Sequence, residues 1–225
     1  MGEAPARARE AGGGVSLTAF QSSLARLVTD LDFRAAVSAG GAEALPSGLS
    51  EVECERLVAV AQDPGLEATR TIYKGFRLSK LLITMPLTRA LLGGERLGRE
   101  VSAFWVAHPP VSFYYLDEAL AFSEHLRARM REGLRVRYLD EVLAYETASV
   151  ELERARLAGD GPTERRVEFR HDPAVLLGTL AEGRRPRAVP VSQHTLIGRL
   201  DRTGKTDWKV TTRRRSQALE GGGRK

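Results

Sequence analysis

The chain has 225 residues, of which 42% are apolar and 28% charged, and its formal net charge is +5. These values are typical of a soluble globular protein with one large or two small domains, and no apolar run approaches the roughly 20 residues that a membrane helix needs. Cys54 is the only cysteine, which excludes an internal disulfide and fits the reducing cytoplasm.

The positive charge is concentrated towards the C-terminus. Residues 160–225 hold 15 Lys and Arg against 8 Asp and Glu, a balance of +7, so residues 1–159 carry −2. A basic final third fits an anionic partner, which could be an acidic peptide, an acidic protein face or nucleic acid. It equally fits a solvated tail, because Arg213-Arg-Arg215 and Arg224-Lys225 lie near its end.

The first half of the chain has helical patterning. Residues 1–15 are rich in Ala, Gly, Arg and Glu and contain no apolar core, which predicts a disordered tail rather than a signal peptide. From 16 to 31, apolar residues recur with the spacing of one helix face. Ser50 and Glu53 form a capping box that opens a second helix, and Pro64 ends it.

A longer helical pattern covers residues 67–92. Pro86 must kink or break it, because proline lacks the N–H and clashes with the preceding turn. Further helices are predicted over 97–107, where Pro109-Pro110 ends the pattern, over 112–131 and over 138–157. Six or seven helices in a row predict an all-α bundle over residues 16–158.

The period changes after residues 159–162, which have the composition of a linker. Residues 166–170 alternate like a short strand, and Asp172-Pro173 predicts the N-cap and first residue of a short helix. Residues 188–200 and 208–212 are β-prone and are separated by a turn. The sequence therefore predicts an α+β fold, with a small α/β module of about three strands over 163–213 and a basic disordered tail over 214–225.

No constellation of catalytic residues has convincing spacing. The four histidines fall in different segments, and there is no CxxC, nucleophile elbow or phosphate-binding glycine loop. His171-Asp172 could be a ligand pair, although Asp before Pro is more typical of a helix entry. Asp140, Glu141 and Glu146 fit a solvated helix face. We therefore expect no catalytic residue, no metal and no cofactor in this chain.

Two features fit a binding role instead. Arg70, Lys74 and Arg77 follow i, i+4, i+7 spacing, which puts three cations on one helix face that either binds a partner or keeps the helix solvated. A sheet of few strands also has an open edge that an extended peptide can join, unless the helical domain covers it. The candidate edges are residues 167–170 and 196–200. The candidate peptide-binding residues are Val167, Phe169, Arg170, Leu196, Ile197 and Arg199.

The order of several segments resembles one family of accessory proteins, whose helical N-terminal domain is catalogued as DNA-binding and of unknown function. The resemblance covers about residues 17–152 and, more loosely, the module that follows. The segments that carry it are 17–28 with Phe20, Ile72-Tyr-Lys-Gly-Phe-Arg-Leu78, Pro86-Leu-Thr-Arg-Ala-Leu-Leu-Gly93, Phe104-Trp105, His108-Pro-Pro110 with Ser112, Tyr138-Leu139, and Tyr145-Glu146.

Members of this family are partner subunits of multinuclear non-haem iron-dependent oxidative enzymes, which modify ribosomally made precursor peptides, for example in methanobactin-type pathways. The resemblance implies that this chain binds the leader part of such a precursor through its C-terminal module. It would then present the rest of the peptide to a TIM-barrel iron enzyme. The long basic C-terminus and the N-terminal tail depart from the shorter members.

Such a role also requires a surface for the enzyme. An aromatic helical face is one candidate, made of Phe104, Trp105, Tyr114 and Tyr115, although aromatic residues at helical spacing fit a packed core as well. The alternative function is a DNA-binding transcriptional regulator, which the basic pI of about 9.6 favours. No helix–turn–helix pattern with a polar recognition helix supports that alternative.

Overall fold

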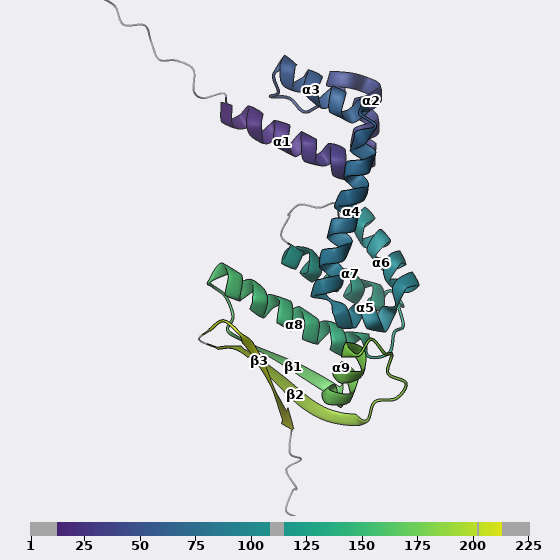
Figure 1. The fold of residues 1–225 in the computed structure, drawn as a ribbon, viewed down its shortest axis with the longest axis vertical. Helices are drawn as coiled ribbons and strands as arrows, with labels where there is room; N and C mark the ends of the chain where they lie inside the picture. The colour runs from purple at the N-terminus through teal and green to yellow at the C-terminus, as the bar shows by residue number, and fades with distance from the viewer. Residues whose placement is uncertain (1–12, 109–114, 202, 213–225) are drawn as a thin grey trace, which may run out of the picture. The chain divides into compact units, whose positions relative to one another are not determined.

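The computed structural model describes residues 13–108, 115–201 and 203–212. Within them the chain forms nine α-helices, a short 3₁₀-helix and one three-stranded antiparallel sheet, which confirms the predicted α+β fold (Figure 1). Pro109-Pro110, which are predicted to end a helix, and the predicted tail at 214–225 lie outside the described residues, as do residues 1–12. The prediction of a tail over residues 1–15 is wrong at its end, because a helix begins at Gly13. The contacts divide the chain into two units, residues 1–78 and 79–225, and the boundary falls inside helix α4 (Gly65–Thr84).

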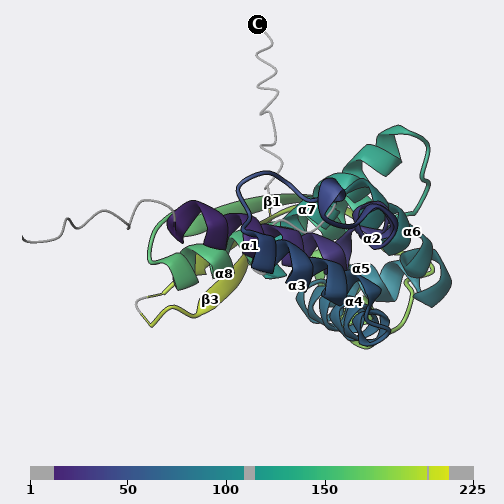
Figure 2. The same cartoon turned by 90° about the horizontal axis from the view of Figure 1, so that it is seen from above.

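The first unit is helical. It contains α1 (Gly13–Thr29), α2 (Leu31–Gly40), the 3₁₀-helix η1 (Gly41–Ala44), α3 (Glu51–Gln62) and the start of α4. Helices α1 and α3 lie side by side (Figure 1 and Figure 2). Its core consists of Leu27, Phe33, Val37, Leu57, Ala61 and Leu66, all buried.

Local capping explains where these helices begin. The Ser50 hydroxyl accepts the Glu53 N–H while the Glu53 carboxylate accepts the Ser50 N–H, so the predicted capping box is confirmed. Asp30 caps α2 in a similar way by accepting the Phe33 N–H at 2.9 Å. The apolar spacing predicts one helix that ends at Leu31, whereas α1 ends at Thr29 and a second helix, α2, begins at Leu31.

The second unit starts with a helical layer. It contains α5 (Pro86–Leu92), α6 (Gly94–Ala107), α7 (Tyr115–Arg131) and α8 (Leu139–Ala158). Pro86 breaks the long helical pattern as predicted, and it is the first residue of α5. Gly93 ends α5 with a φ of +70°, a conformation that suits glycine. Helix α8 is central, because it packs against α5, α7 and the sheet.

The sheet completes the second unit. Its strands are β1 (Glu164–His171), β2 (Val191–Leu200) and β3 (Thr206–Thr212), in the spatial order β1-β2-β3. Helix α9 (Pro173–Ala181) follows β1 and begins at the predicted Asp172 cap, whose carboxylate accepts the Ala174 N–H. The predicted turn joins β2 to β3, where Asp201 Oδ1 accepts the Lys205 N–H at 2.9 Å. Residues 159–162 join α8 to β1 within this unit.

Candidate functional site

The strand order decides which of the two predicted edges exists. Within the part of the chain that the structure describes, strand β1 pairs only with β2, so residues 167–170 do lie on an edge strand. Strand β2 pairs with β1 on one side and with β3 on the other. The prediction that residues 196–200 form an edge is therefore wrong, because the hairpin partner β3 occupies that side. The second edge of the sheet belongs to β3.

The six predicted peptide-binding side chains divide between the two faces of the sheet. Val167, Phe169 and Leu196 are buried on the face that packs against α8, with 3%, 2% and 4% of their surface exposed. These three are core residues. Arg170, Ile197 and Arg199 lie on the opposite face, because side chains alternate along a strand. Their different positions mean that the predicted set does not form one surface.

The face of the sheet away from α8 is charged. Glu164 accepts from Arg166 at 2.9 Å and from Arg199 at 2.6 Å, and these bonds hold the pKa of the Glu164 carboxyl below its ordinary value. An open groove of about 390 Å³ lies beside them on β2 and β3. Its lining residues are Ile197, Arg199, Leu200, Asp201, Asp207, Lys209 and Thr211.

A buried carboxylate closes part of the β1 edge. Glu141, on the first turn of α8, is 7% exposed. Its Oε1 accepts the N–H groups of Arg170 and His171 at 2.5 and 3.1 Å, and its Oε2 lies 2.8 Å from His171 Nδ1. The ladder is irregular at this point, between Phe169 and His171. The amide N–H at Arg170 is therefore already bonded, which leaves this end of β1 unsuited to strand addition.

Among the described residues, no strand pairs with the outer edge of β3, which we call the open edge. The Leu200 N–H donates to Thr163 O at 2.9 Å, so the even-numbered residues of β2 bond towards β1 and the odd-numbered ones towards β3. In β3, the residues opposite those odd positions are Asp207, Lys209 and Thr211. By the same alternation, the backbone N–H and C=O groups of Trp208 and Val210 point away from the sheet.

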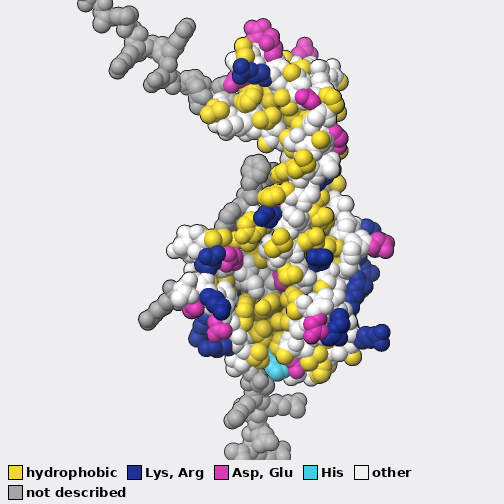
Figure 3. All heavy atoms as spheres, viewed as in Figure 1, with side chains coloured by type: hydrophobic (Ala, Val, Ile, Leu, Met, Phe, Trp, Pro, Cys, Tyr) yellow, Lys and Arg dark blue, Asp and Glu magenta, His cyan; other side chains and the backbone are white. Residues whose placement is uncertain are grey.

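Trp208 and Val210 also carry apolar side chains on the α8 side of the sheet. The Trp208 ring lies 4.8 Å from the Tyr145 ring of α8, centroid to centroid, and packs over Gly198. Val210 remains 53% exposed, and Leu157 at the end of α8 is 46% exposed. Hydrophobic side chains are visible on the surface around α8 and the strands in Figure 3. The open edge is therefore bordered by apolar surface.

The aromatic face predicted for an enzyme partner is partly core. Phe104 is 1% exposed, and its ring meets the Phe122 ring edge-on at 5.3 Å. Trp105 is half-buried and donates its indole N–H to Glu118 at 2.9 Å. Tyr115 is also half-buried and lies beneath the Lys80 ammonium. Tyr114 lies outside the described residues, so Trp105 and Tyr115 are the accessible members described.

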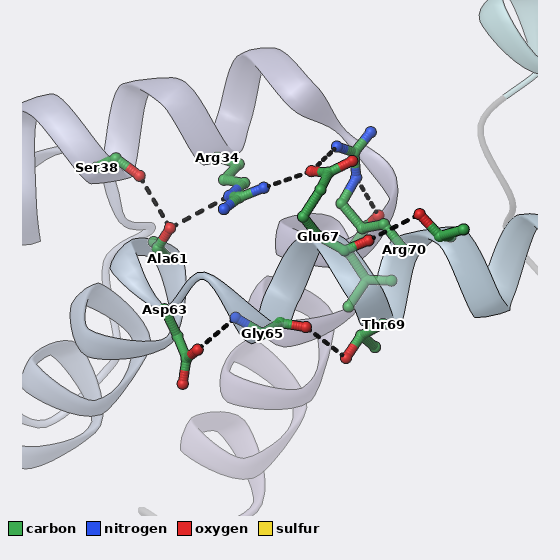
Figure 4. Close-up of polar contacts among 10 residues, drawn as sticks. Arg34, Ser38, Ala61, Asp63, Gly65, Glu67, Thr69 and Arg70 are labelled. Carbon is green, nitrogen blue, oxygen red and sulfur yellow. Dashed lines mark hydrogen bonds and ion pairs between the residues drawn. The ribbon is translucent and has the colours of Figure 1, made fainter.

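The row of three cations predicted on α4 does not form. Arg70 and Arg77 are buried, at 4% and 8% exposure, and only Lys74 of the three is exposed. Arg70 donates to Val28 O at 3.1 Å and to Glu67 at 2.8 Å, and Glu67 also accepts from Arg34 (Figure 4). These contacts hold helices of the first unit together. Because two of the three cations are buried, the row neither binds a partner nor forms a solvated helix face, and both interpretations are wrong.

Glu146 is a second buried carboxylate on α8. Its two oxygens accept the N–H groups of Leu87 and Thr88 and the Thr88 hydroxyl, at 2.6, 3.0 and 2.6 Å. These donors belong to the first turn of α5, whose N-cap residue makes no side-chain hydrogen bond of its own. Burial raises the pKa of Glu146 to about 7, against the opposing effect of the three hydrogen bonds.

The described residues contain no group of three or more His, Cys, Asp and Glu side chains that could hold a metal ion. None of the described helices has the length and apolar character needed to cross a membrane. No protein-family model matches the chain, and no curated protein matches its sequence.

Proposed function

We propose that this chain is a non-catalytic partner subunit, working in the cytoplasm, that binds the leader of a ribosomally made precursor peptide. The bound peptide is presented to an iron-dependent peptide-modifying enzyme. The resemblance described above suggests this role, and the open edge of β3 is the observation that supports it. An extended peptide can add to such an edge as a fourth strand, with main-chain hydrogen bonds supplying affinity.

The residues beside the edge favour one kind of peptide under this proposal. Backbone groups of Trp208 and Val210 are available for pairing, and the surface beside them on the α8 side is apolar. On the other side of the sheet, Asp207 and Lys209 are exposed. A leader that fits both faces alternates apolar side chains, directed towards α8, with polar or charged ones directed outwards. The β1 edge is the weaker candidate because Glu141 already accepts the Arg170 N–H.

The test is a proline placed where it removes only an outward-pointing N–H. Val210→Pro preserves the pairing of β3 with β2, since proline is tolerated on an edge strand with its nitrogen towards solvent. The proposal predicts that a short precursor peptide is encoded beside this gene, and that this variant loses at least about tenfold in affinity for it. Val210→Thr, which keeps the N–H, is the matched control and should bind within about twofold of the wild type.

Titration calorimetry measures these affinities, and circular dichroism checks that each variant is folded. The proposal is overturned if the wild type does not bind the precursor, or if Val210→Pro binds it as tightly as Val210→Thr. The second half of the proposal predicts that a TIM-barrel iron enzyme is encoded nearby and that it co-purifies with the wild type, with iron on the enzyme.

A further inference from the structure

Two loop segments of the second unit are basic. One segment, residues 131–137, runs from the last residue of α7 into the loop before α8, and the other, residues 182–191, contains the loop after α9 and the first residue of β2. Each contains three arginines and one glutamate, a balance of +2. Together they carry +4, compared with +5 for the whole chain. We call residues 131–137 and 182–191 the basic corner.

Side-chain contacts join the two loops into one surface. Arg137 donates to Arg187 O at 3.1 Å, and the Val189 N–H donates to the Tyr138 hydroxyl at 3.1 Å. Tyr138 is the only non-glycine among the described residues with a positive φ, at 68°. Its ring packs edge-on against His171, with centroids 4.8 Å apart. The anchored Tyr138 therefore holds both loops against the start of α8.

Several arginines of the basic corner have no carboxylate partner. The Arg187 side chain has no ion pair or hydrogen bond within the part of the chain that the structure describes. Arg135 donates only to the Met130 carbonyl, and Arg137 lies over the Tyr138 ring. The two glutamates of the loops are already paired, Glu132 with Arg129 and Glu182 with Arg184. The positive charge of the corner is thus largely uncompensated.

Apolar groups lie among these cations. Val191 is 82% exposed, and Ala188 and Pro190 are exposed beside it. Arginine bordered by apolar side chains is typical of protein–protein interfaces, where arginine is enriched and lysine depleted. A phosphate backbone would gain nothing from the valine and the prolines, because its contacts are made by cations, polar groups and backbone N–H groups. The composition therefore favours a protein partner.

We infer that the basic corner docks on an acidic surface of a protein partner, with Arg135, Arg137 and Arg187 contacting carboxylates. The inference rests on the proposed function for the identity of that partner, the peptide-modifying enzyme. The corner adjoins the end of β1 and the start of α8, whereas the open edge is β3, two strands away. A peptide on β3 and a protein on the corner therefore use separate surfaces.

The experiment uses a fluorescein-labelled peptide of Glu, Asp and Leu as an acidic probe, and a random duplex DNA as the competing class. Binding to the full chain is measured by fluorescence anisotropy at two salt concentrations. The test variant is Arg135→Glu with Arg187→Glu. Its matched control is Arg56→Glu with Lys74→Glu, which makes the same charge change at exposed residues of the first unit that have no described ion-pair partner.

We expect the test variant to lose at least about tenfold in affinity for the acidic peptide, and the control variant to stay within about twofold of the wild type. The inference is overturned if the test variant binds normally, or if the control loses as much. It is also overturned if the duplex binds more tightly than the peptide and the test variant loses the duplex. If the proposed function fails but the inference holds, Val210→Pro binds the precursor normally while the test variant still loses affinity for the acidic peptide.

Discussion

The carboxylates of α8 differ in what they do although they lie on one helix. Asp140 is exposed, whereas Glu141 accepts the N–H groups at the end of β1 and Glu146 accepts those at the start of α5. Each buried carboxylate thus supplies acceptors to backbone donors that have no partner in their own element. The expectation of a solvated face was wrong for both glutamates, because α8 is packed against α5 and the sheet at once.

The raised pKa of Glu146 predicts how stability depends on pH. Between about pH 4.5 and pH 7 the side chain is largely protonated in the folded protein but ionised in the unfolded chain, so the folded state binds the extra proton. The free energy of unfolding therefore falls as pH rises through this window. Where the folded state binds one full proton more than the unfolded chain, the free energy of unfolding falls by roughly 1.4 kcal/mol per pH unit.

Glu146→Gln removes this titration, so the difference in stability between the wild type and this variant depends on the titration of Glu146. Burial lowers the pKa of His125, which makes stability rise with pH below 6.5 in both proteins and cancels in the comparison. Urea unfolding across the window should show the wild type losing about 2–3 kcal/mol relative to the glutamine variant. A difference that stays constant with pH would mean that Glu146 is ionised throughout.

At the scale of elements, signals local in sequence predicted the structure well. The Ser50 capping box, the break at Pro86, the Asp172 cap and the turn after β2 all depend on residues within four positions of one another. The pattern does not reveal helix α2, because its Asp30 cap lies directly after the apolar residues of α1 and no break separates the two helices in the sequence.

Predicting the candidate site needed information that is not local. The patterns in residues 166–170 and 188–200 indicate strands but not which strands are neighbours, so they cannot show that β2 is the central strand. Val167 and Phe169 have the side chains that an apolar peptide site would need, but α8 buries them. Trp208 and Val210 were inside a predicted strand and became site residues only when the strand order showed that β3 is an edge.

The packing of β2 against β3 has a specific requirement at Gly198. A Cβ at this position would lie 2.7 Å from atoms of the Trp208 ring, which also packs on Tyr145. Gly198→Ala should therefore destabilise the protein by about 1–3 kcal/mol, the cost of overpacking. Without the ring, the same substitution should cost little, since alanine reduces the entropy of the unfolded chain.

Urea unfolding of Gly198→Ala, Trp208→Leu and the double variant forms the cycle that measures this coupling. We expect the double variant to be more stable than the sum of the single effects predicts. If the effects of the two substitutions on the free energy of unfolding simply add, the Trp208 ring moves aside at no cost.

At the scale of the whole molecule, the chain consists of two units whose boundary lies within the continuous helix α4. The first unit has its own core around Leu27 and Leu57, and its own polar network around Glu67. The open β3 edge and the basic corner both belong to the second unit. Each unit therefore has the internal contacts expected of a separately cooperative region.

This division predicts that damage to one unit stays local. Ser50→Ala removes the capping box of α3 and should cost about 1 kcal/mol. Native-state hydrogen exchange should then show lower protection of the amides of α1, α2 and α3, while α8 and the three strands exchange as in the wild type. Glu146→Gln should give the reverse pattern, because its partners all lie in the second unit. If either substitution instead lowered protection equally in both units, the chain would unfold as a single cooperative region, with α4 transmitting the loss of stability from one core to the other.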